Sequence, residues 1–295
     1  MSPRRRGLDR VGLLLLGLLA GIVASALLLY VYVDRSRTRQ VEERVQVALG
    51  LPEEAFELED VEEDGSLRVV LRRVAFLDAA GDTIVSAPTA RGRLVARTLS
   101  ADEGPIVIDQ VVLERPYLRL MQRGAGDWNA FDILRAEADG APLNVPEEEK
   151  SRPIAFQGMR VVDGTVRVAT PYVSPATPPT GRMAAFRQPE RIQGGGGRTF
   201  TIRWLRNVNA TLPLVRVGPD GGWRAEVAAL TADVTNPDTR VRRLAGWVEA
   251  DPDKTIRFDI DALRTPRSSF DGSGRVRFAD AGPVFDLDLR AHPLA

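Results

Sequence analysis

Pairs of carboxylates on alternate residues are the side chains of this chain whose types and spacing best suit chemistry. Asp259 and Asp261 form one pair, and Asp286 and Asp288 form another. Two facing carboxylates serve as general acid and base in glycoside hydrolysis. Each pair lies in a segment where charged and apolar residues alternate, so both carboxylates fall on the strand face that carries the other charges. We therefore interpret the pairs as part of a solvated surface.

Other catalytic constellations lack their key residue types. The chain has no cysteine and a single histidine, His292. These counts exclude a thiol nucleophile, and they disfavour a Ser-His-Asp triad and a zinc site of His and Cys ligands. The net charge of zero argues against a general nucleic-acid binder. We expect no enzymatic activity, no metal and no cofactor, since an enzyme would need a site built only from carboxylates, arginines and hydroxyls.

Residues 11–33 are apolar or small and carry no charge. A helix of this length spans roughly 35 Å, enough to cross a ~30 Å hydrocarbon core. Arginines before this segment indicate that residues 1–10 form a cytoplasmic N-terminus. A cleaved signal peptide is the alternative, because 24–26 is a run of small residues, but cleavage there would leave an apolar new terminus. We predict an uncleaved single-pass anchor, whose apolar surface includes Leu13, Leu16, Leu19, Ile22, Leu28 and Val33.

From Leu67 onward, apolar and polar residues alternate in short segments separated by Gly, Pro and Asp. This pattern is typical of an antiparallel β-sheet, and it predicts a mainly β protein with a few short helices. Asp163-Gly164 is expected to form a hairpin turn. The alternation puts apolar residues on one face, which a second sheet, a helix or a ligand must cover. Six residues of the last strands are candidates to line a groove, or equally to fill an ordinary core: Ile256, Phe258, Ile260, Phe285, Leu287 and Leu289.

Composition divides the part that follows the anchor into two β regions. Residues 34–140 form the first, with short helices that include one over 128–136. Residues 141–153 are rich in Pro and Glu and are predicted to be a linker. The second β region covers 154–295, and within it residues 171–197 are expected to form a disordered loop because they contain few apolar residues and a run of four glycines.

Three segments resemble the AsmA-like family, the AsmA- and TamB-type membrane-anchored proteins of double-membrane bacteria. The first is VVLERPYLRLMQRGAGDWNAFDIL, in which a strand ends at a proline, an aromatic-Leu-Arg-Leu strand follows, and Trp-Asn opens a short helix. The second is FQGMRVVDGTVRV, and the third is RTPRSSFDGSGRVRFADAGPVFDLDLRAHPL, which is similar to a repeated unit of that family. The motif residues are Pro116, Tyr117, Leu118, Trp128 and Asn129.

The resemblance implies an antiparallel sheet curved into a trough, apolar inside and charged outside, behind a single inner-membrane anchor. It implies a periplasmic location for the bulk of the chain, and a role in phospholipid transport or envelope biogenesis through a hydrophobic groove. Expected partners are the inner membrane, phospholipid acyl chains and other envelope proteins. The chain is shorter than the best-known members, and we expect it to be either a short member or the N-terminal portion of a longer protein. An anchored β-sandwich that acts as a scaffold or interaction module, without lipid transport, is the alternative that remains open.

Overall fold

The described part of the chain is almost entirely β-structure, which confirms the prediction of a mainly β protein. The computed structural model describes residues 56–64, 67–78, 80–99, 104–123, 129, 153–172, 190–193, 197–218, 222–235, 238–251, 255–279 and 282–293. One short helix, α3 (Ala96–Leu99), occurs within these residues. None of their helices has the length and hydropathy needed to cross a membrane. The predicted anchor at 11–33 lies outside the described residues, as do the predicted helix at 128–136, apart from Asn129, and the predicted linker at 141–153, apart from Pro153.

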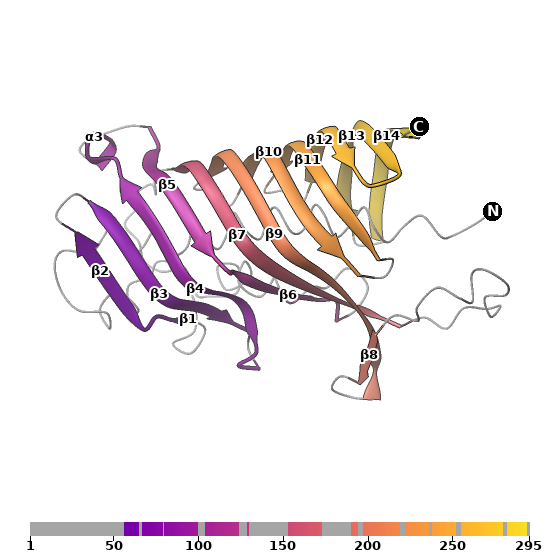
Figure 1. The fold of residues 1–295 in the computed structure, drawn as a ribbon, viewed down its shortest axis with the longest axis horizontal. Helices are drawn as coiled ribbons and strands as arrows, with labels where there is room; N and C mark the ends of the chain where they lie inside the picture. The colour runs from indigo at the N-terminus through magenta and orange to yellow at the C-terminus, as the bar shows by residue number, and fades with distance from the viewer. Residues whose placement is uncertain are drawn as a thin grey trace, which may run out of the picture.

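All the described strands belong to a single sheet of fourteen strands (Figure 1). Its main path runs β1-β3-β4-β5-β7-β9-β10-β11-β12-β13-β14, while β2 pairs with β3, β6 pairs with both β4 and β7, and β8 pairs with β9. The strands are β1 (Phe56–Glu57), β2 (Asp60–Asp64), β3 (Arg68–Leu77), β4 (Thr83–Leu94), β5 (Ile106–Glu114), β6 (Tyr117–Met121), β7 (Ile154–Pro171), β8 (Glu190–Gln193), β9 (Thr199–Val217), β10 (Trp223–Val234), β11 (Thr239–Ala250), β12 (Thr255–Arg264), β13 (Ser268–Ala279) and β14 (Gly282–Pro293).

The prediction of a purely antiparallel sheet is wrong at one position. Strand β7 runs parallel to β5 and β6, with Ile108 beside Phe156 and Leu118 beside Val166. Parallel neighbours need a crossover connection, which here falls within residues 122–153. The same pairing joins the first and second β regions into one continuous sheet. Four residues of the expected loop at 171–197 form β8, which pairs with β9.

The predicted hairpin turn at Asp163-Gly164 is also wrong, because β7 continues through both residues. A tight two-residue hairpin turn of the primed type I needs positive φ at both central positions. Here Asp163 has φ 54°, whereas Gly164 is not among the positive-φ glycines. The backbone N–H of Asp163 donates to Oδ1 of Asn209 on β9 at 3.1 Å. Asp163 is therefore a bulge within a continuous strand, held by the neighbouring strand.

A line of backbone irregularities crosses the sheet from β5 to β13. Gln110 and Gly158 have φ of 54° and 62° and lie between the same two register pairs of β5 and β7. Farther across, Gly246 and Gly272 have φ of 144° and 146° and are linked through their shared partner Ile260. Bulges of this kind bend a strand and increase its twist. Figure 1 shows the long strands bending near their upper ends.

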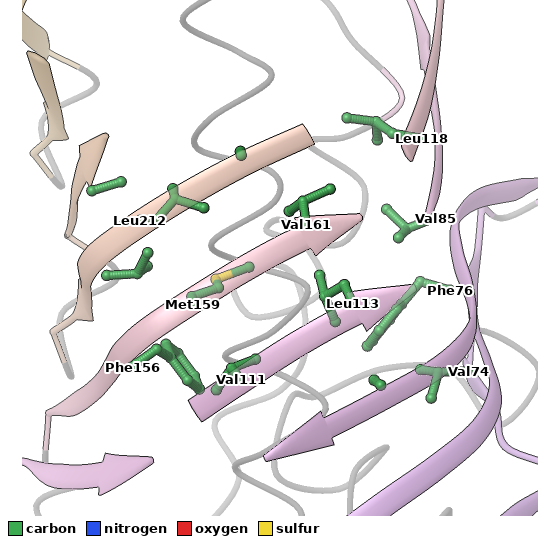
Figure 2. Close-up of a cluster of buried hydrophobic side chains, with 14 of the residues drawn as sticks. Val74, Phe76, Val85, Val111, Leu113, Leu118, Phe156, Met159, Val161 and Leu212 are labelled. Carbon is green, nitrogen blue, oxygen red and sulfur yellow. The ribbon is translucent and has the colours of Figure 1, made fainter. Parts of the chain in front are cut away.

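On β5 and β7, the bend shifts the side-chain alternation by one residue. The buried residues on either side of it are three apart rather than two, as with Ile108 and Val111, or Phe156 and Met159. This step keeps the apolar residues of a bent strand on the same face of the sheet. Figure 2 shows the result, with Phe156, Met159 and Val161 along β7 beside Val111 and Leu113 of β5.

Candidate functional site

The most extended feature of the described residues is an apolar face that crosses the sheet without interruption. Register pairs define a row of nine positions from β4 to β14, and every member is apolar or glycine. This row consists of Leu94, Ile108, Phe156, Val215, Ala225, Val248, Phe258, Gly274 and Leu287. We call this side of the sheet the apolar face. At about 4.8 Å per strand, the row extends for about 38 Å.

A second row lies two residues along each strand from the first. It comprises Ile106, Ile154, Val217, Trp223, Ala250, Ile256, Val276 and Phe285. Ile260 and Leu289 belong to a third row, on either side of Gly272. The register therefore brings all six candidate groove-lining residues to one face. It also extends that face to β4, β5, β7, β9 and β10, whose residues sequence reasoning did not assign to it.

Exposure of the apolar face rises towards β14. Val248 and Phe258 are buried, with 2% and 5% of their surface exposed. Ile260 and Phe285 are half-buried, whereas Leu287 and Leu289 on the last strand are 38% and 45% exposed. Together with Val284, these two are the exposed large hydrophobic residues of the described part of the chain. The face is thus covered across most of the sheet and open at the β14 end.

Glycines determine how closely side chains and neighbouring strands approach each other near this open end. The ring of Phe258 lies over Gly274, where an added Cβ would be 2.9 Å from the ring Cζ and 2.6 Å from Cδ2 of Leu287. At Gly246 and Gly272, an added Cβ would lie only 2.0 and 2.1 Å from the carbonyl oxygens of Asp259 and Asp288. Both glycines therefore permit a close approach of the next strand at the bend. The same arrangement therefore occurs twice. Gly246 of β11 pairs with Ile260 of β12, and Gly272 of β13 pairs with Leu289 of β14.

The opposite face carries charged side chains, several of them in compensating pairs. Arg224 and Glu249 approach to 3.2 Å, and Arg275 and Asp286 also approach to 3.2 Å on neighbouring strands. Arg224 also lies over the ring of Trp247, 4.4 Å from its centroid. Opposite charges that face each other across neighbouring strands stabilise the pairing of those strands. These contacts therefore support the sheet from its charged side.

The four carboxylates singled out from the sequence lie on two different strands, β12 and β14. Asp286 pairs with an arginine of β13, and Asp288 is 3.6 Å from Arg290 on its own strand. His292 contacts Asp271 at 2.6 Å on the exposed surface. No group of three or more His, Asp or Glu residues suited to a metal occurs among the described residues. The arrangement of Asp286 and Asp288 is that of surface ion pairs.

Asn129 of the sequence motif is completely buried and hydrogen-bonds to strand β6. The backbone N–H of Met121 donates to its Oδ1 at 2.6 Å, and its Nδ2 donates to the carbonyl of Arg119 at 2.9 Å. Its own N–H donates to the carbonyl of Met121 at 2.9 Å. The amide therefore replaces a neighbouring strand along this part of β6. Trp128 lies outside the described residues.

The rest of the motif forms a break between β5 and β6. Pro116 is buried, and its carbonyl accepts the N–H of Thr165 at 2.8 Å. Tyr117 and Leu118 then open β6, and Leu118 pairs with Val85 on β4. Because proline has no N–H, it is tolerated in a sheet only at such irregularities. The motif residues that the structure describes thus shape the edge of β4–β6.

An ionic cluster that sequence reasoning missed closes the β3–β4 turn. The buried carboxylate of Asp78 accepts the backbone N–H groups of Ala80 and Asp82, both at 3.0 Å, and lies 3.3 Å from Arg123. Arg119 donates to Asp82 at 2.6 Å. This hydrogen bond holds the pKa of Asp82 below its usual value and raises the pKa of Arg119. Only the turn residues indicated this site in the sequence, because the partner arginines follow much later in the chain.

No protein-family model matches the chain, and no curated protein matches it.

Proposed function

We propose that this chain is an inner-membrane-anchored periplasmic β-protein of the AsmA-like type that binds phospholipid acyl chains on its apolar face. Its role is phospholipid transport or envelope biogenesis, and it is not an enzyme. The observation that carries the proposal is the uninterrupted row from Leu94 to Leu287. A charge anywhere in that row would interrupt a path for acyl chains, and none occurs.

The dimensions of the apolar face support this function. A lipid leaflet accounts for about half of a ~30 Å hydrocarbon core. The row of about 38 Å is longer than one acyl chain extends, so it suits passage along the sheet better than a single fixed binding pocket. Exposed Leu287 and Leu289 would form the entry or exit for acyl chains. The charged opposite face keeps the protein soluble along the same length.

The scaffold alternative is favoured by the burial of residues such as Phe156 and Phe258. A face that is covered by the protein itself contributes to stability and leaves no room for a ligand. In that case, lipid would reach only the β13–β14 end, and the chain would serve as an anchored interaction module. The two functions therefore differ in whether acyl chains contact the positions between β4 and β12.

Site-specific photocrosslinking tests the proposal in the full chain in its membrane. Benzoylphenylalanine at Leu287 and Ile260 on the apolar face is compared with the same probe at Asp288 and Arg257 on the charged face. We expect phospholipid adducts, identified by mass, from the first pair and none from the second. Adducts at Leu287 but not at Ile260 would favour the scaffold. The absence of lipid adducts from both apolar positions, in protein that retains its β-sheet circular dichroism, would refute lipid binding.

A transfer assay separates binding from transport. The purified full chain is mixed with donor vesicles that contain fluorescent phosphatidylethanolamine and with unlabelled acceptor vesicles. We expect faster transfer with the unmodified chain than with Ile260→Asp, because the substitution puts a charge in the acyl-chain path. Asp259→Asn on the opposite face is the matched control and should leave the transfer rate unchanged. Equal rates for all three proteins would exclude transport along this face.

A further inference from the structure

The two ends of the sheet are built differently. At one end, β3 is bordered by β1 and β2, which have only two and five residues. Strand β2 reads DVEED and is therefore strongly acidic. Short strands and charges are the usual devices that prevent a sheet edge from pairing with another chain. This end is protected against association.

The β14 end is built differently, because its edge strand is twelve residues long and its charged residues, Asp286, Asp288 and Arg290, lie on the face opposite the apolar face. Figure 1 shows β14 at this end of the sheet. Strand β14 pairs with β13 over twelve consecutive partners without a register shift, whereas the β10–β11, β11–β12 and β12–β13 pairings each contain at least one. Within the described residues, no strand pairs with its other side. No charged residue of β14 falls on the apolar face, where Phe285, Leu287, Leu289 and Ala291 lie in alternation. A long, regular, apolar edge of this kind is a template for strand addition.

We propose that β14 pairs in an antiparallel manner with β14 of a second copy of this chain, with Leu289 on the two-fold axis. In this register, a residue that lies n positions before Leu289 is opposite the residue that lies n positions after Leu289 in the second copy. Asp288 then lies opposite Arg290 of the second copy, and Asp286 lies opposite His292 of the second copy. On the apolar face, Leu289 meets its own copy, and Leu287 meets Ala291 of the second copy. Because the two-fold axis repeats each pair, complementary polar contacts form on both sides of the axis.

Neighbouring registers of the two β14 strands are disfavoured because they place like charges opposite each other. A two-fold axis at Asp288 places two aspartates directly opposite each other, and an axis at Arg290 does the same with two arginines. An axis at Leu287 places Asp286 opposite Asp288 of the second copy. Shifting the register by a single residue puts acidic and apolar side chains on the same face. Among these registers, the one centred on Leu289 is complementary on both faces.

Existing contacts on β14 permit this pairing. Asp288 and Arg290 are about 70% exposed and lie 3.6 Å apart, and Asp286 and His292 contact β13 residues at the surface. Exposed ion pairs of this type are weak and exchange partners readily. The dimer would cover Leu287 and Leu289 at their exposed edge and join two apolar faces into one. The inference depends on the β14 edge alone and holds whether or not the face binds lipid.

Cysteine crosslinking tests the register because the chain has no cysteine of its own. In the full chain, Leu289→Cys puts two thiols opposite each other on the two-fold axis, within disulfide distance. Ala291→Cys on the same face is the matched control, because the two thiols are then four residues apart along the strands, about 13 Å. Under mild oxidation, we expect a disulfide-linked dimer from the first variant and little from the second. Equal crosslinking from both variants, or crosslinking of the Leu289→Cys variant to a different protein only, would overturn the proposal.

A charge exchange tests the same interface without cysteine. Asp288→Arg and Arg290→Asp each place like charges opposite each other at two positions of the dimer, and we expect each to raise the dimer dissociation constant about tenfold or more. The double variant Asp288→Arg/Arg290→Asp restores opposite charges and should restore dimerisation. Both positions are exposed, and circular dichroism verifies the fold. Analytical ultracentrifugation in detergent measures the dissociation constant. A chain that stays monomeric at every concentration, or a double variant no tighter than the single ones, would refute the dimer, while lipid adducts at Ile260 remain a separate result.

Discussion

Gly246 holds the bend of the sheet, and replacing it with alanine should destabilise the fold strongly. Its φ of 144° belongs to a region that other residues essentially do not adopt, which costs about 1–3 kcal/mol. The added Cβ would also lie 2.0 Å from the carbonyl oxygen of Asp259 and 2.9 Å from Cα of Ile260. Both are backbone atoms of β12, so β12 must move away from β11. Losing one or two of the ladder hydrogen bonds adds about 1–3 kcal/mol. We expect Gly246→Ala to lower the free energy of unfolding by about 4 kcal/mol.

Gly158→Ala is the matched control for this prediction. Gly158 also has positive φ, 62°, but an added Cβ there would meet nothing within 4 Å. Its substitution should cost only the left-handed backbone energy, about 1–2 kcal/mol. Urea unfolding of the full chain in detergent, followed by tryptophan fluorescence, compares the two variants, and Trp247 beside Gly246 reports on the bend. If the two losses agree within about 0.5 kcal/mol, the close approach of β12 is not what requires the glycine.

Three further perturbations test the apolar face, the motif and the turn. Phe258→Asp buries a carboxylate and should lower the free energy of unfolding by about 3–5 kcal/mol in urea unfolding, whereas Leu287→Asp at the open end should cost less than about 1 kcal/mol. Asn129→Ala leaves two backbone groups of β6 without partners, and we expect a loss of about 2–4 kcal/mol and faster amide exchange at Met121. The depressed pKa of Asp82 means that its pairing stabilises the fold above pH ~4 and is lost as the pH falls through the lower pKa of the folded state. Asp82→Asn should therefore be less stable than the parent chain at about pH 6, and the difference in urea midpoint should shrink as the pH falls below ~4.

Each of these has an outcome that contradicts it. Equal destabilisation by the Phe258 and Leu287 substitutions would mean that the exposure gradient does not describe the folded chain. An Asn129→Ala variant with unchanged exchange at Met121 would show that another group pairs with β6. A difference between Asp82→Asn and the parent chain that stays constant as the solution is acidified would show that the Arg119 hydrogen bond does not determine the pKa of Asp82.

Alternation in the sequence was enough to predict the strands and their apolar face near the end of the chain. In β12 and β14 the period of two runs without a break from Ile256 to Ile260 and from Phe285 to Leu289, and the register confirms that these residues share a face. The same logic was not extended to β5 and β7. There the period is interrupted at Gln110 and Gly158, so strict alternation assigns the residues on either side to opposite faces. The apolar face was thus underestimated wherever a bulge crosses a strand.

The parallel pairing of β7 was beyond sequence reasoning for a different reason. Whether a strand lies parallel or antiparallel to an earlier one depends on the path of the connection between them. Residues 122–153 are long enough for a crossover and include the predicted helix at 128–136, but neither feature by itself fixes the direction of the next strand. The predicted hairpin at Asp163-Gly164 failed similarly, because Asn209 on a distant strand stabilises the Asp163 backbone in a bulge. Both errors arise from long-range contacts.

The bend of the sheet could not be predicted from the sequence of any single strand. A bulge bends the strand that contains it, and residues with positive φ recur on several strands of this sheet. The line consists of Gln110 on β5, Gly158 on β7, Gly246 on β11 and Gly272 on β13, each with positive φ. Glycine occupies three of the four positions, but the chain has 26 glycines, so the line emerges only when the strands are placed in register. Because β13 repeats the device at Gly272, next to the open edge, a second copy paired through β14 would carry the same line of bends in reverse order beyond the two-fold axis, and the joined apolar face would stay bent over its full length.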